Sequence, residues 1–163
     1  KALAAIAAED PVFCERFVLR FVGPVDHKVV ESATAAGLGA HIERLGRLSH
    51  AEAMRQMQRA RVLLLPINDT PNSAGILPGK LYEYLSVGRP ILAVGPRDGD
   101  VARVLGEAHL LLPREPAQAD HVRIRAAFDL ETGIVGEAID RYDRKELAGS
   151  MAALLDAEAS TRP

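Results

Sequence analysis

Residues 61–95 constrain the fold more than any other part of the chain. They read RVLLLPINDTPNSAGILPGKLYEYLSVGRPILAVG, which is an aliphatic run, a polar loop, a short amphipathic segment and a second aliphatic run. This is about the length of one βαβ unit, roughly 30 residues or more. The two aliphatic runs, residues 62–65 and 91–94, are nearly continuous, as is typical of strands buried on both faces of a parallel sheet. The stretch therefore predicts two parallel strands joined by a helix.

The rest of the chain alternates helix and strand signals. Ser49 and Glu52 form the sequence pattern of a capping box, the clearest helix start in the chain. Asp26 is a second candidate cap, and either Asp98 or Asp100 is a third. Pro11 is expected to help end the first helix. The predicted strands are residues 17–22, 41–45, 62–65, 91–94 and 109–112, and the predicted helices are residues 1–9, 27–36, 51–59, the segment from Lys80, the segment around 101–105, 117–130 and 141–157.

This alternation predicts an α/β fold, namely an open, doubly wound, Rossmann-like parallel sheet with helices on both faces. Thr132 and Gly133 interrupt the pattern after residue 130, and the last helix has Leu147, Met151 and two further leucines on one face. A doubly wound domain usually begins with a strand, whereas this sequence begins with a helix signal. We therefore expect that the first strand of the sheet is missing.

The composition fits one such domain. The chain has 163 residues, of which 48% are hydrophobic but only 4% aromatic, so its core must be mainly aliphatic. A net charge of −2, with both signs spread along the chain, gives no reason to expect a nucleic-acid partner. Cys14 is the only cysteine and cannot form an internal disulfide, which favours a cytoplasmic location. No run of apolar residues is long enough for a membrane span.

The sharpest motifs of catalysis and nucleotide binding are missing. The sequence contains neither a G-x-x-x-x-G-K-[ST] phosphate loop nor a G-x-G-x-x-G fingerprint. Its five histidines are scattered without the spacing of metal ligands, so no metal site is expected. Cys14 has no basic neighbour in the sequence and is interpreted as a structural thiol. The candidate site must therefore come from the fold itself.

Parallel sheets bind ligands in the crevice at the carboxyl ends of their strands. Here, that crevice would be lined by the loop of residues 68–77 and by the first helical turn, with Lys80 and Glu83. These two residues, three apart, could simply form an ion pair on the helix surface. Alternatively, the free amides of the helix N-terminus and Lys80 could bind a diphosphate, and Glu83 could accept hydrogen bonds from ribose hydroxyls. Gly75 and Gly79 would allow the ligand to approach the backbone closely.

The segment PGKLYEYLSVGRPILAVGPRDGD resembles the donor-binding segment in the C-terminal domain of GT-B glycosyltransferases of the group 1 family. The resemblance continues upstream through LRFVGPVD and IERLGRLSHAEAMRQMQRARVLLLP, and downstream through RYDRKELAGSMAALL. It implies that residues 1–163 are a single nucleotide-sugar-binding domain. The donor would be a nucleotide diphosphate sugar, with no cofactor and no metal ion.

The resemblance also implies roles for individual residues. Glu83 matches the second glutamate of the family's E-x7-E motif, which binds the ribose, whereas Gly75 stands where the first glutamate is expected. The amides near Ile76 and Leu77 resemble those that hold the distal phosphate. Lys80 would assist them and is the residue expected to matter most for the reaction rate. The turn that contacts the nucleobase is matched by Gly46, Arg47 and Leu48, and a turn at the pocket edge is matched by Gly23.

For the whole protein, the resemblance implies a retaining, metal-independent sugar transfer to a hydroxyl acceptor in polysaccharide or glycan biosynthesis. The acceptor would bind an N-terminal domain that this sequence lacks, so the fragment alone is expected to be inactive. The intact protein could associate with the inner face of a membrane. Three alternatives remain open: a nucleotide-sugar epimerase of the same architecture, a non-catalytic nucleotide-binding module, and a flavodoxin-like regulatory domain. The last would need a phosphoacceptor, for which Asp69 is the only candidate.

Overall fold

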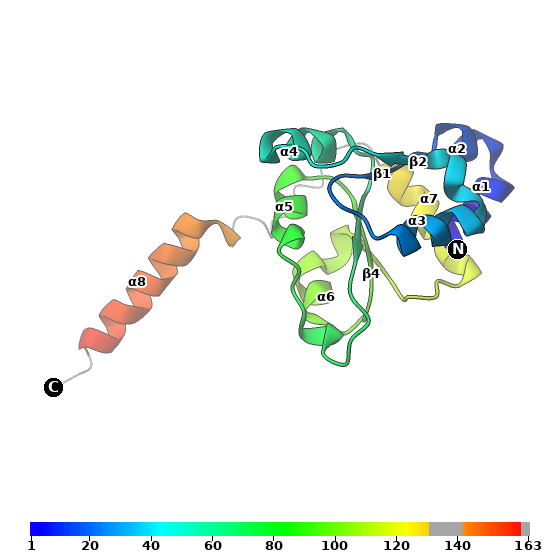
Figure 1. Cartoon of the computed structure of the whole chain (residues 1–163). Coiled ribbons are helices and arrows are strands. Elements are labelled where there is room, and N and C mark those ends of the chain that lie inside the picture. The colour runs from blue at the N-terminus through cyan, green and yellow to red at the C-terminus, as the bar shows by residue number, and fades with distance from the viewer. Residues whose placement is uncertain (131–141, 161–163) are drawn as a thin grey trace.

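The computed structural model describes residues 1–130 and 142–160. Within these ranges, helices and strands alternate for most of the chain (Figure 1). The strands are β1 (Leu19–Phe21), β2 (Ile42–Arg44), β3 (Leu63–Pro66), β4 (Ile91–Val94) and β5 (Leu110–Leu112). The α-helices are α1 (Ala2–Glu9), α2 (Pro11–Arg16), α3 (His27–Ala33), α4 (His50–Arg59), α5 (Lys80–Val87), α6 (Asp100–Leu105), α7 (Gln118–Asp129) and α8 (Arg144–Ser160). Shorter helical turns are η1 (Thr34–Leu38), η2 (Gly39–His41), η3 (Ser73–Gly75) and η4 (Gly106–Ala108).

All strand pairs in the described residues are parallel. β1 pairs with β2, and β3, β4 and β5 form a second ladder in that order. The predicted α/β class with parallel strands is confirmed. The sheet, however, is divided into two parts, because β1 pairs only with β2 and β3 only with β4 among the described residues.

Helices cover both faces of the three-stranded part. On one face Leu63, Leu65 and Ile91 pack against α5 and α6, through residues such as Leu81 and Val104. On the other face Leu92 and Leu112 pack against Ile6 of α1 and Ile124 of α7. Both faces of the strands are therefore buried, which is why the sequence reads as continuous aliphatic runs there. Figure 1 shows β4 with α5 and α6 on one side and α7 on the other.

A third cluster of apolar residues lies beside β1. Ala7 of α1, Phe17 and Leu38 are its buried members, and Phe13 and Leu19 pack against it. The ring of Phe13 stacks on that of Phe17, with centroids 5.2 Å apart. Since α1 also contributes Ile6 to the core under β4 and β5, this helix holds the two parts of the sheet together.

The capping predictions are partly correct. Ser49 and Glu52 form both hydrogen bonds of the capping box of α4, and the carboxylate of Asp26 accepts the amide of Lys28 at the start of α3. α1 ends at Glu9, and Asp10, the residue before Pro11, is extended, as predicted; Pro11 also opens α2, where a missing N–H costs nothing. α6 has Gly99 as its N-cap and no side-chain cap, so the prediction for Asp98 or Asp100 is wrong.

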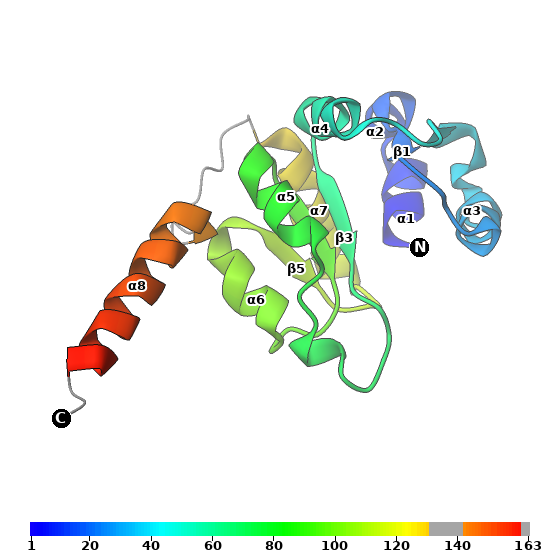
Figure 2. The ribbon, with the colours of Figure 1, turned by 60° about the vertical axis from the view of Figure 1, so that its left-hand side comes forward.

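The C-terminal helix stands apart from the rest of the described chain (Figures 1 and 2). α8 begins at Arg144, and the predicted break at Thr132 and Gly133 lies outside the described residues. The predicted apolar face of α8 is exposed to solvent, with Leu147 50% and Leu154 65% exposed. Among the described residues, no helix is both long and apolar enough to cross a membrane.

His109 should make the stability of this fold depend on pH. Its ring lies at the start of β5, where Nδ1 accepts the amide N–H of Ile91 at 3.3 Å. Burial lowers the pKa of His109 from its ordinary value of 6.5. The unfolded chain therefore takes up this proton at higher pH than the folded chain, so stability is complete above about pH 6.5 and falls as the pH drops toward the folded pKa.

Urea unfolding at about pH 7.5 and about pH 5.5 tests this expectation. In His109→Asn, an amide oxygen can accept from Ile91 without titrating, so the loss of stability at low pH should be smaller than in the wild type. His50→Asn changes an exposed histidine and is the matched control. An unchanged pH dependence in His109→Asn would contradict the role of this ring.

Candidate functional site

The loops that follow β3 and β4 pack closely at the carboxyl edge of the sheet. A Cβ added at Gly95 would lie 2.8 Å from Cγ1 of Ile67, and one added at Gly99 would lie 2.8 Å from the carbonyl oxygen of Ala74. Real Cβ atoms do not approach so closely, so both positions require glycine unless a backbone moves. The β3–α5 loop therefore packs tightly against the start of α6.

This supported loop leads into the N-terminus of α5, where backbone donors are exposed. Within the described residues the amides of Leu77, Gly79 and Lys80 form no hydrogen bond. α5 also has no side-chain cap. The Ile76 amide, by contrast, donates to the carbonyl of Ser73 at 3.3 Å, so this predicted donor is already engaged. An uncapped helix N-terminus attracts anions through its free N–H groups and its dipole.

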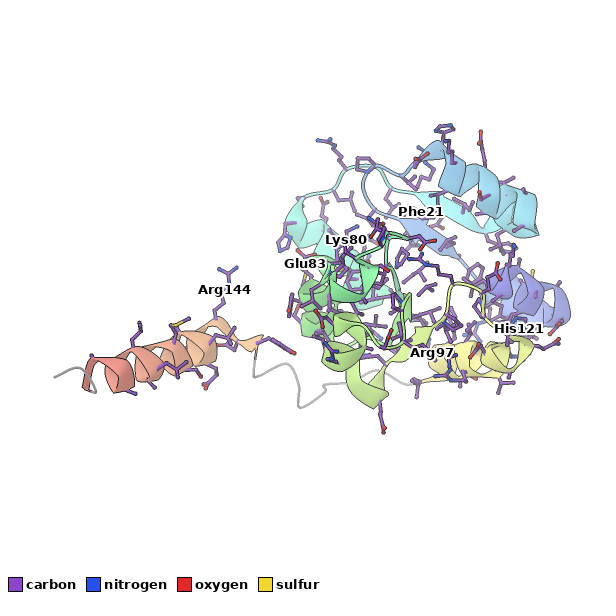
Figure 3. All side chains as sticks on the ribbon, turned by 90° about the horizontal axis from the view of Figure 1, so that it is seen from below. Phe21, Lys80, Glu83, Arg97, His121 and Arg144 are labelled. Atoms are coloured by element: carbon purple, nitrogen blue, oxygen red, sulfur yellow. The ribbon has the colours of Figure 1, made fainter. Side chains whose placement is uncertain are left out.

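Lys80 and Glu83 both lie exposed on the first turn of α5 (Figure 3). The ion pairs of the described residues do not include one between them, although i,i+3 pairs do form elsewhere, such as Asp100 with Arg103. The simpler interpretation, a surface ion pair, is not what the structure forms. Both charges are available to a ligand.

The neighbouring Tyr84 points to the protein interior and stays neutral. Burial, and to a smaller extent the Glu83 carboxylate, raises the pKa of Tyr84 above its ordinary value of 10.0. Its phenol therefore adds no charge to the site near neutral pH. The negative charge that α5 contributes to the candidate site therefore comes from the Glu83 carboxylate.

Gly75 ends the helical turn η3, before the exposed amides. A Cβ built there would meet no heavy atom within 4 Å, and its φ is not in the left-handed region. A glutamate would therefore fit at this position without strain. The backbone therefore does not require glycine at position 75. Because this chain has glycine there, it lacks the side-chain contact that a glutamate at this position could make with a ligand.

The second predicted group of site residues lies at the carboxyl ends of β1 and β2. The amide of Gly23 donates to the carbonyl of Gly46 at 2.6 Å, which brings these two predicted residues together. Both have positive φ, 92° and 67°, which favours glycine. Arg47 is exposed and Leu48 half-buried. No hydrogen bond or ion pair of the described residues joins this turn to the loop before α5.

Two arginines at the same edge of the sheet were not predicted. Arg114 follows β5, and its Nε lies 3.2 Å from Oδ1 of Asp69 in the β3–α5 loop. Arg97 follows β4, and its Nη2 lies 3.9 Å from Oδ1 of the buried Asp120. Their position in the sequence could have indicated them, since each directly follows a proline that lies just beyond a predicted strand. Asp69 is thus paired with a cation.

Cys14 also has a partner that the sequence did not reveal. Its Sγ lies 3.6 Å from Nε2 of His41, and Nδ1 of His41 contacts the carbonyl of Phe17 at 3.1 Å. The two residues are 27 positions apart, so only the fold brings them together. The thiol is half-buried beside the cluster around Phe17, in keeping with a structural role.

Comparison with models of protein families finds no match. Comparison with curated proteins finds none either. Among solved structures, the chain is similar to the crystal structure of WaaG, a glycosyltransferase involved in lipopolysaccharide biosynthesis, with 19% sequence identity and a TM-score of 0.60. The match covers 88% of this chain and 38% of that chain.

The chain has a Rossmann-like fold shared with a glycosyltransferase. It spans less than half of that glycosyltransferase. At this level of identity, the similarity shows the fold alone, so the activity must be argued from the site.

Proposed function

We propose that the chain is the donor-binding domain of a glycosyltransferase and binds a nucleotide diphosphate sugar at the N-terminus of α5. One observation carries the proposal. On a fold shared with a glycosyltransferase, the free amides of Leu77, Gly79 and Lys80 are exposed next to the side chains of Lys80 and Glu83. The site thus combines donors for an anion with an acceptor for hydroxyls.

The amide cluster suits a diphosphate. Backbone N–H groups at a helix N-terminus donate to phosphate oxygens, and the helix dipole favours their negative charge. Lys80 adds a full positive charge at the same turn. During sugar transfer, negative charge develops on the leaving diphosphate, and donors already in place stabilise it without rearrangement. Lys80 is therefore the residue of this chain that we assign to the catalytic step.

Glu83 is assigned to the ribose. A carboxylate near a nucleotide sugar commonly accepts hydrogen bonds from the two neighbouring ribose hydroxyls. The turn of Gly23 and Gly46, together with Arg47 and Leu48, is assigned to the nucleobase side of the donor. The amide of Ile76 donates to the carbonyl of Ser73 and is therefore not assigned to the phosphates. Ile76 is included in the site only because it lies in the loop next to the free amides.

For the intact protein, we infer a retaining transfer of the sugar to a hydroxyl acceptor. Cationic side chains and backbone amides would stabilise the negative charge of the leaving diphosphate, which a metal ion does in other transferases. The acceptor would bind a separate N-terminal domain, and the product would be a polysaccharide or related glycan. The cytoplasm, or the inner face of a membrane, is the location that fits a nucleotide-sugar donor. Residues 1–163 alone would bind the donor without transferring its sugar.

Calorimetric titration of the protein with nucleoside diphosphates and their sugar conjugates tests the proposal. We expect saturable binding of at least one of them, and Lys80→Ala should weaken it by about 1–2 kcal/mol, roughly tenfold, because a charge-assisted phosphate contact is lost. Lys145→Ala removes an exposed lysine of α8 and is the control. If no nucleoside diphosphate binds, the assignment of this edge as a donor site is wrong.

The same ligands separate the two enzymatic alternatives in the intact protein. A transferase needs a hydroxyl acceptor and releases a nucleoside diphosphate, whereas an epimerase releases an altered sugar without any acceptor. A module that binds nucleotides but does neither would be non-catalytic. Product identification by mass spectrometry and NMR, with and without an acceptor, distinguishes these outcomes.

A further inference from the structure

The loop of residues 68–79, which joins β3 to α5, extends beyond the end of β3 (Figure 2). Its hydrogen-bonded amides have partners inside the loop: Ser73, Gly75 and Ile76 donate to loop carbonyls at 2.9, 3.0 and 3.3 Å. No backbone hydrogen bond of the described residues joins the loop to a segment other than α5, into which it leads. A loop bonded only to itself keeps many conformations unless something else fixes it.

One ion pair connects this loop to the far strand of the sheet. Nε of Arg114 lies 3.2 Å from Oδ1 of Asp69, and among the described residues it is the one ion pair of residues 68–79. Asp69 lies two positions beyond Ile67, which is buried and whose amide donates to the carbonyl of Val94 at 2.9 Å. The ion pair therefore holds the loop just after its last hydrogen bond to the sheet.

Arg114 is a well-anchored partner for the loop. β5 is paired with β4 up to Leu112, which is 1% exposed and whose carbonyl accepts the amide of Gly95 at 3.0 Å. Pro113 follows and restricts the backbone further. Arg114 therefore projects from a fixed edge of the sheet, so its contact transfers order from the sheet to the loop.

We propose that Arg114 is a positioning residue, whose ion pair with Asp69 holds the β3–α5 loop in the arrangement that presents the free amides before α5 to a ligand. The contact of Ala74 with Gly99 fixes the middle of the loop, and the ion pair fixes its start. The consequence for donor affinity rests on the proposed function. A loop that is already ordered loses less conformational entropy when a diphosphate binds.

Hydrogen exchange in the ligand-free protein tests the order of the loop. The side chain of Asp69 is 81% exposed, and exposed ion pairs are weak, so the expected effect is modest. Arg114→Gln should speed exchange of the three internally bonded loop amides by about two- to fivefold. The amide of Leu63, at the opposite end of β3, should exchange as before. The double variant Asp69→Arg, Arg114→Asp should restore slow exchange in the loop.

Nucleotide binding distinguishes a positioning role from direct contact with the ligand. The probes are uridine, adenosine and guanosine diphosphate, titrated by calorimetry. If Arg114 acted on the ligand directly, Asp69→Asn would strengthen binding, because it removes a negative charge near an anion. The positioning role predicts the opposite sign: both Arg114→Gln and Asp69→Asn should weaken binding by about two- to fivefold. Both differences should shrink at about 1 M salt, where the Debye length is about 3 Å.

Arg123→Gln is the matched control, because it removes an exposed arginine whose ion pair with Asp120 does not involve the loop. Unchanged exchange of the loop amides in Arg114→Gln, or equal acceleration in Arg123→Gln, would overturn the proposal. So would tighter nucleotide binding by Asp69→Asn. If none of the three diphosphates binds to the wild type, the donor-site assignment fails, and the exchange rates by themselves still decide whether Arg114 orders the loop.

Discussion

Glu83→Ala is expected to weaken binding of a nucleotide diphosphate sugar by roughly tenfold to a hundredfold, because hydrogen bonds to a charged acceptor are each worth about 1.5–3 kcal/mol. Glu83 is exposed on the first turn of α5, and no ion pair of the described residues occupies its carboxylate. The variant should fold normally, because it removes no core contact. Isothermal titration calorimetry with wild type and variant measures the loss.

The ribose assignment can be separated from a general charge effect. A 2′-deoxy nucleotide lacks one of the two hydroxyls, so the wild type should bind it more weakly than the ribonucleotide. In Glu83→Ala, this difference should largely vanish. Glu146→Ala, on the exposed first turn of α8, controls for the loss of a negative charge. If Glu83→Ala binds the donor with unchanged affinity, Glu83 has no role in the ribose contact.

Leu81→Ala is expected to lower the free energy of unfolding by about 2–5 kcal/mol, the largest effect of a single substitution considered for this fold. Leu81 follows Lys80 on α5, but its side chain is 0% exposed and lies in the core against β3 and β4. Alanine would leave a cavity that the surrounding aliphatic residues cannot fill completely. Urea denaturation followed by circular dichroism measures the change.

Leu154→Ala is the matched control, because it makes the same substitution at a side chain that is 65% exposed on α8. Its expected effect lies within about 0.5 kcal/mol of zero. Since Leu81 anchors the helix that presents Lys80 and Glu83, Leu81→Ala should also weaken ligand binding at temperatures where the variant is still folded. Equal stability of the two variants would contradict the core position of Leu81.

Much of the candidate site could be placed from the sequence because its parts are close in the chain. Lys80 and Glu83 are one helical turn apart, and the loop before them ends at the start of the same helix, so the local pattern alone predicts the first turn of α5. Contacts between distant segments were not predicted. Examples are the pair of Arg114 with Asp69 and that of Cys14 with His41, whose partners are set by how strands and helices pack.

The sequence by itself determined the α/β class and the parallel strands, since continuous aliphatic runs separated by capped helices leave few other folds. Only the tertiary structure decided that the amide of Ile76 donates to the carbonyl of Ser73 and that Lys80 and Glu83 form no ion pair. It also decided that the sheet divides between β1 and β3. The reason is physical: periodicity records which side chains are buried, whereas hydrogen-bond partners depend on distances between segments far apart in the chain.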